Sequence, residues 1–74
     1  MHPTTVAPTT YPPAVTSALR SLRRRSVMPA YVSATIRAAY PSGDVPAPLQ
    51  VVADACRDRG ATWSKIDAAL RGLT

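Results

Sequence analysis

The 74-residue chain lacks most of the residue types from which catalytic and metal sites are built. It contains no glutamate and no phenylalanine, a single cysteine (Cys56) and a single histidine (His2). One cysteine excludes an intrachain disulfide, and one histidine without a second ligand nearby does not form a zinc site. No serine–histidine–aspartate set, carboxylate pair or glycine-rich phosphate loop can be assembled from the sequence. We therefore expect no enzyme activity, no metal, no cofactor and no small-molecule substrate.

Long apolar runs are also missing. No stretch approaches the roughly 18 consecutive apolar residues of a membrane span, and the sequence contains no signal-peptide hydrophobic region. We expect no membrane partner and a reducing, cytoplasmic location. There the thiol of Cys56, on the apolar side of a predicted helix, would be an inert part of the core.

The N-terminal segment is rich in proline and threonine. Residues 1–13, MHPTTVAPTTYPP, contain four of the eight prolines and four threonines. Proline removes backbone donors, and no helical or strand period runs through the segment, so we predict a disordered tail over 1–12. The remaining residues, 13–74, would form one domain close to the smallest size at which a single core is sufficient.

Apolar residues in this remainder recur at helical spacing. The spacing, together with proline or threonine at the starts, predicts four helices over about 13–26, 29–40, 48–59 and 63–71. No strand period is sustained, so the predicted fold is all-α, a small bundle of three to four short helices. Gly60 is expected to end the third helix in a left-handed conformation.

The same spacing predicts the core. Met28 is expected to pack at the start of the second helix, and Trp63, the only tryptophan, to be the main anchor of the core. The predicted inward-facing residues are Val15, Ala18, Leu19, Leu22, Val32, Ile36, Ala39, Tyr40, Leu49, Val52, Ala53, Cys56, Trp63, Ile66, Ala69 and Leu70.

Basic residues are concentrated in the first half of the chain. Residues 1–43 contain five arginines and no acid and carry all of the net charge of +5, whereas four bases balance four aspartates over 44–74. Like charges on one helix are destabilising unless an anion offsets them. The arginine cluster of the first predicted helix therefore favours an anionic partner, either nucleic acid or an acidic protein surface. This cluster comprises Arg20, Arg23, Arg24 and Arg25.

The C-terminal stretch VVADACRDRGATWSKIDAALRGLT, residues 51–74, has the outline of a helix, a glycine turn and a second helix. It resembles the helix-turn-helix segments of small actinobacterial and bacteriophage DNA-binding regulators. In one register the resemblance makes Gly60 the turn glycine and 62–71 the recognition helix. In a second register, residues 60–74 form the positioning helix and the start of the recognition element.

The first register implies outward-facing residues that contact DNA. Ser64, Lys65, Ala68 and Arg71 would lie on the exposed side, with Lys65 and Arg71 contacting bases or phosphates. Asp67 on the same side would repel phosphate, and Arg59 stands where the family has an apolar residue.

Two functions remain open from the sequence. The first is a small, transcription-regulator-like and phage-encoded DNA-binding protein, whose arginine cluster grips phosphates and for which a homodimer would supply a useful site. The second is a non-enzymatic helical module that binds and modulates a host or partner protein through an acidic surface. If the arginines of the first helix and the outward side of the last helix share one face, DNA is favoured.

Overall fold

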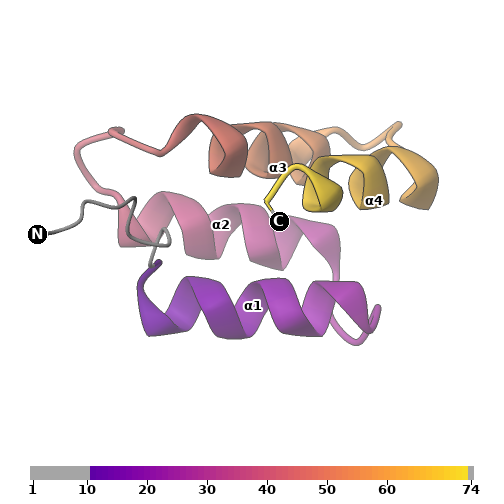
Figure 1. Ribbon diagram of the computed structural model, residues 1–74, viewed down its shortest axis with the longest axis horizontal. Helices are drawn as coiled ribbons and strands as arrows, with labels where there is room; N and C mark the ends of the chain where they lie inside the picture. Colours follow the sequence, from indigo (N-terminus) through magenta and orange to yellow (C-terminus); the bar gives the residue numbers. More distant parts are fainter. Residues whose placement is uncertain (1–10, 74) are drawn as a thin grey trace, which may run out of the picture.

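The computed structural model describes residues 11–73, which form four α-helices (Figure 1). No strand occurs in this part of the chain, so the all-α prediction is confirmed. Residues 1–10 with His2, which hold most of the predicted tail, and Thr74 lie outside the described part. The helices are α1 (Pro13–Arg23), α2 (Pro29–Ala39), α3 (Ala47–Arg57) and α4 (Trp63–Arg71).

The helix α2 is the centre of the arrangement. It packs against α1 on one side and α3 on the other, and successive helices run in opposite directions (Figure 1). The helix α4 packs against α3 and reaches the C-terminal end of α1 through a side-chain contact. The four short helices therefore share one core, and no helix can bury its apolar stripe without its neighbours.

Proline lies in the first turn of three of the helices. Pro13, Pro29 and Pro48 lie in the first turns of α1, α2 and α3, where a backbone N–H would have no partner within the helix. The helix α3 starts at Ala47, one residue earlier than predicted, because Pro48 is compatible with its first turn. The helix α4 begins where predicted and is capped by Thr62, whose Oγ1 accepts the Lys65 N–H at 3.2 Å.

The ends of the first three helices come before the predicted positions, most clearly in α1. The Arg25 N–H donates to the Leu22 carbonyl at 2.9 Å, and the Ser26 N–H donates to the Ser21 carbonyl at 3.0 Å. This pair of bonds is a Schellman motif, which requires a left-handed residue, usually glycine. Arg25 occupies that position with φ 57°. The prediction placed Arg25 within the helix because no glycine marks its end.

Gly60 does not have the role predicted for it. The only described glycine with positive φ is Gly43, in the loop between α2 and α3. After α3 the chain turns instead through Asp58, whose carboxylate accepts the Gly60 N–H at 2.9 Å and whose carbonyl accepts the Ala61 N–H at 3.1 Å. Aspartate commonly forms turns of this kind.

The predicted helical stripes form the core, with exceptions at its edges. The largest fully buried side chains come from three helices: Val15, Leu22, Val32, Ile36, Leu49 and Val52. Trp63 is only half-buried because it opens α4 at the edge of the domain, and it is not the central anchor that was predicted. Met28, the N-cap residue of α2, is 74% exposed, so the prediction that it packs inward is wrong. Ala39 and Tyr40 pack at the margin, while Ala55 is buried.

The burial pattern predicts which truncations unfold the domain. Leu22→Ala should lower the free energy of unfolding by about 2–5 kcal/mol, because it leaves a cavity at a fully buried position. Val51→Ala should change it by less than about 0.5 kcal/mol, because Val51 is 56% exposed. Urea denaturation followed by far-ultraviolet circular dichroism measures both. Equal effects of the two changes would contradict this core.

Candidate nucleic-acid interface

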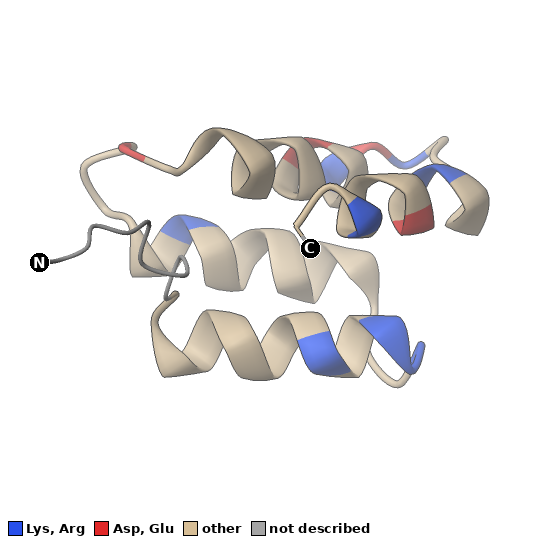
Figure 2. Cartoon of the chain, viewed as in Figure 1, with Lys and Arg blue, Asp and Glu red and all other residues tan. Residues whose placement is uncertain are grey.

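The seven residues predicted to contact nucleic acid are all exposed. They lie on α1, immediately after it, and on α4, and the fold brings these segments together. Lysine and arginine positions mark the C-terminal end of α1 and parts of α4 (Figure 2). A hollow of about 290 Å³ between them is lined by Arg23, Asp67, Leu70 and Arg71. We call this surface the α1–α4 face.

Arg25 joins the two parts of the α1–α4 face. Its Nη2 lies 3.1 Å from the Asp67 Oδ2, and its guanidinium carbon lies 4.9 Å from the centroid of the Trp63 ring. A cation over an indole face at this distance is attracted by about 0.5–1 kcal/mol at an exposed site. Arg25 is therefore engaged within the fold. Asp67 was predicted to repel phosphate, but the positive charge of Arg25 compensates its negative charge.

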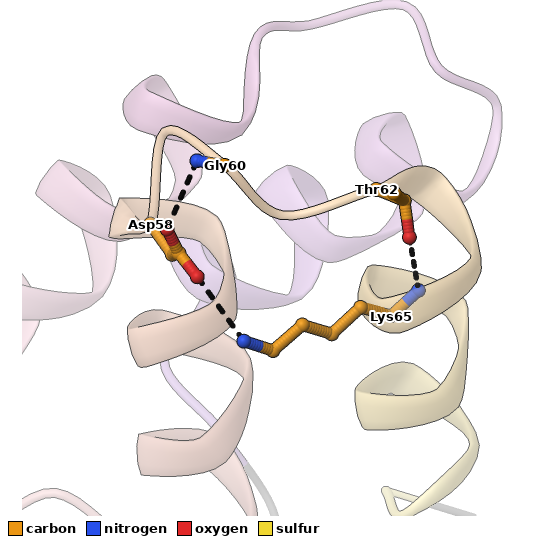
Figure 3. Close-up of polar contacts among 4 residues, drawn as sticks. All are labelled: Asp58, Gly60, Thr62 and Lys65. Atoms are coloured by element: carbon orange, nitrogen blue, oxygen red, sulfur yellow. Dashed lines mark hydrogen bonds and ion pairs between the residues drawn. The ribbon is translucent and has the colours of Figure 1, made fainter.

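Lys65 also has a partner within the fold. Its Nζ lies 3.1 Å from the Asp58 Oδ2, and the same carboxylate accepts the Gly60 N–H (Figure 3). The pKa of the Asp58 carboxyl is lowered, mainly by the hydrogen bond from the Gly60 N–H and next by the hydrogen bond and positive charge of Lys65. These contacts link the turn after α3 to the first turn of α4, so Lys65 contributes to the local structure.

Three arginines at the C-terminal end of α1 have no carboxylate partner in the described part of the chain, and one of them, Arg23, lines the hollow. No carboxylate among the described residues lies within 4.0 Å of Arg20, Arg23 or Arg24. Arg71 and Ser64 are exposed on α4. The surface therefore combines a cationic end of α1 with a helix whose outward side chains are partly small and uncharged.

Sequence reasoning found the exposed positions but missed their internal partners. Asp58, two residues before Gly60, is a turn signal that is visible in the sequence. The Arg25–Asp67 contact joins residues 42 positions apart and has no local signal. Predicting it would have required the packing of α4 against α1 and α3.

Comparisons with known proteins find no relative. No protein-family model matches the chain, and no curated protein or solved structure matches it. In residues 11–73, no three histidine, cysteine or acidic side chains gather in a group that could hold a metal ion. No helix in this part of the chain is both long and apolar enough to cross a membrane. The candidate interface therefore rests on its own geometry.

The relative stability of the Arg25→Gly and Arg25→Ala variants tests the left-handed backbone at this position. Both substitutions remove the contacts with Trp63 and Asp67, but only glycine relieves the strain of φ 57°. Arg25→Gly should therefore be more stable than Arg25→Ala by about 1 kcal/mol in urea denaturation.

The neighbouring residue provides the matched control. Arg24 is right-handed, with φ −84° and ψ −5°. At that position alanine should be the more stable of the two substitutions by about 0.5–1 kcal/mol. An alanine advantage at both positions would contradict the left-handed geometry of Arg25.

The Asp58 contacts predict a loss of stability in acid. Because the pKa of Asp58 is lowered from 3.8 in the folded protein, its contribution is present at neutral pH and is lost as pH falls through the folded pKa. Asp58→Asn should therefore flatten the acid side of the profile of unfolding free energy against pH. Parallel profiles for Asp58→Asn and wild type would refute the linkage.

Proposed function

We propose that this chain is a small DNA-binding protein that contacts duplex DNA through the α1–α4 face. The observation that supports this most directly is that Arg23 of α1 lines one hollow with Asp67 and Arg71 of α4, and that Arg25 contacts Asp67. In the opposite case, with these features on different sides, a protein partner would have been favoured.

The arginines of α1 would supply affinity. Arg20, Arg23 and Arg24 have no carboxylate partner within the described part of the chain, so an external anion would offset their mutual repulsion. Arginine donates several hydrogen bonds in a planar fork that matches phosphate oxygens. Such contacts are independent of sequence and release counterions, so binding would weaken steeply with salt.

The helix α4 would enter the major groove. That groove is about 12 Å wide and admits one α-helix. Ser64 and Ala68 are exposed and small, so the helix can approach base edges closely, while Arg71 extends from its last turn. This arrangement corresponds to the first register of the helix-turn-helix resemblance, with α3 as the positioning helix and α4 as the recognition helix. The regulator role belongs to the same proposal.

The contacts of Arg25 would set the distance between the end of α1 and α4. By binding Trp63 and Asp67 of α4, Arg25 fixes the end of α1 against that helix. The phosphate-contacting arginines and the groove-contacting helix would then approach DNA as one rigid unit. Rigid presentation lowers the entropy lost on binding.

Salt-dependent binding tests the proposal. Fluorescence anisotropy with a labelled random-sequence duplex measures the association constant. Its logarithm should fall linearly with the logarithm of the salt concentration from about 50 mM upward. Arg24→Gln should reduce the magnitude of that slope by about 0.9, the value expected for one lost phosphate contact. Arg37→Gln, a matched loss of charge on α2, should leave the slope unchanged. Absence of binding at the lowest salt, or equal effects of both variants, would refute the proposed face.

A further inference from the structure

A second surface lies between α2 and α3. Two hollows of about 350 and 620 Å³ share Ser33, Arg37 and Arg57. The first extends toward the loop after α2, and the second extends toward the turn after α3. We call the combined surface the α2–α3 groove. It shares no lining residue with the hollow between α1 and α4.

The floor of the groove contains a buried hydroxyl without a hydrogen bond. Ser33 is 4% exposed and is the only buried residue with a hydroxyl or charged side chain in the described part. Its Oγ bonds to no described residue, whereas Thr35, also on α2, donates to the Tyr31 carbonyl at 2.9 Å. A buried hydroxyl without a partner is destabilising. The hydroxyl lines both hollows, so a group seated there would complete its hydrogen bonding.

The larger hollow is mainly apolar, and arginines lie at the rim of the groove. Met28 is 74% exposed at one end, and small or apolar residues line the larger hollow: Ala30, Ala34, Cys56, Ala61 and Ile66. Arg57 lies 3.9 Å from Asp54, but Arg37 and Arg59 have no carboxylate within 4.0 Å among the described residues. Asp58 at the same rim is held by Lys65. The rim therefore has a surplus of positive charge.

Charge complementarity identifies the occupant as an acidic chain other than this one. Residues 1–10 contain no acidic side chain. Three of the four aspartates are already paired, at Asp54, Asp58 and Asp67. A second copy of the chain therefore offers little to the rim arginines.

We propose that the α2–α3 groove binds an acidic amphipathic segment of a partner protein. Its apolar side chains would lie on the floor beside Met28, its carboxylates would reach Arg37 and Arg59, and one polar group would hydrogen-bond to the Ser33 hydroxyl. An amphipathic helix lying in an apolar groove is a common mode of peptide recognition. The inference does not depend on DNA binding, since it concerns different residues.

Selection from a random displayed peptide library tests the chemistry of the occupant. The full chain is the target, and the most enriched peptide is synthesised and titrated into ¹⁵N-labelled protein. Enriched peptides should combine aspartate or glutamate with large apolar residues at helical spacing, and should shift the amide signals of Met28, Ser33 and Ala61. Failure to enrich any peptide, enrichment of neutral or basic peptides, or shifts confined to other surfaces would overturn the proposal.

Charge reversal tests the rim. Arg37→Glu should weaken binding of the selected peptide by about tenfold or more. Arg24→Glu, the same change at the C-cap of α1, should alter it by less than about twofold, because Arg24 lines neither hollow of the groove and exposed charges are screened by salt. Equal losses in the two variants would show general charge attraction and overturn the groove assignment. Duplex DNA that displaces the peptide and shifts the same groove signals would overturn it as well.

The Ser33 hydroxyl has its own test. Ser33→Ala should leave the stability of the free protein unchanged or raise it, because it removes an unpaired buried group. The same variant should weaken peptide binding by about fivefold, the loss of one hydrogen bond. If stability rises and affinity is unchanged, the hydroxyl takes no part in recognition and that element of the proposal is wrong.

Discussion

The left-handed backbone at Arg25 is the constraint on which the α1–α4 face depends. A right-handed residue there would continue α1, because Arg24 before it is already right-handed. Instead the chain turns at φ 57°, and the Arg25 side chain meets Trp63 and Asp67. Glycine would adopt this backbone at lower cost but has no side chain for those contacts. The arginine therefore combines a strained backbone with a contact that no glycine could make.

Two charged residues of α4 are also paired within the fold. Its acidic residue, Asp67, pairs with Arg25, and its lysine, Lys65, pairs with Asp58 of the preceding turn. Both pairs are exposed, and such pairs contribute little stability singly. Their effect is geometric, because they tie α4 to α1 on one side and to the turn after α3 on the other. The cations left without a carboxylate partner in the described part of the face belong to α1.

The sequence predicted the core better than it predicted the site. Apolar periodicity depends on residues a few positions apart, so it correctly placed Leu22, Ile36 and Leu49 in the interior. The end of α1 was missed because no glycine marks its left-handed residue, and the contacts of Arg25 depend on packing between distant segments, which local spacing does not encode. The same periodicity correctly predicted that the seven candidate residues are exposed. The partners of these residues were not predicted. Arg25, for example, is paired with Asp67, which lies 42 positions away in the sequence.

The composition of α4 also bears on how selective such a protein can be. Lys65 is engaged with Asp58, so Ser64 and Arg71 are the main polar groups of the proposed recognition helix. Phosphate contacts from α1 give affinity without sequence information, and two polar side chains distinguish few base pairs. A protein with this face alone would discriminate weakly among sites. A partner held in the α2–α3 groove would add contacts to DNA or neighbouring proteins, and joined binding sites raise affinity through effective concentration. We therefore infer that, if both surfaces function, selectivity belongs to the assembly and not to α4 alone.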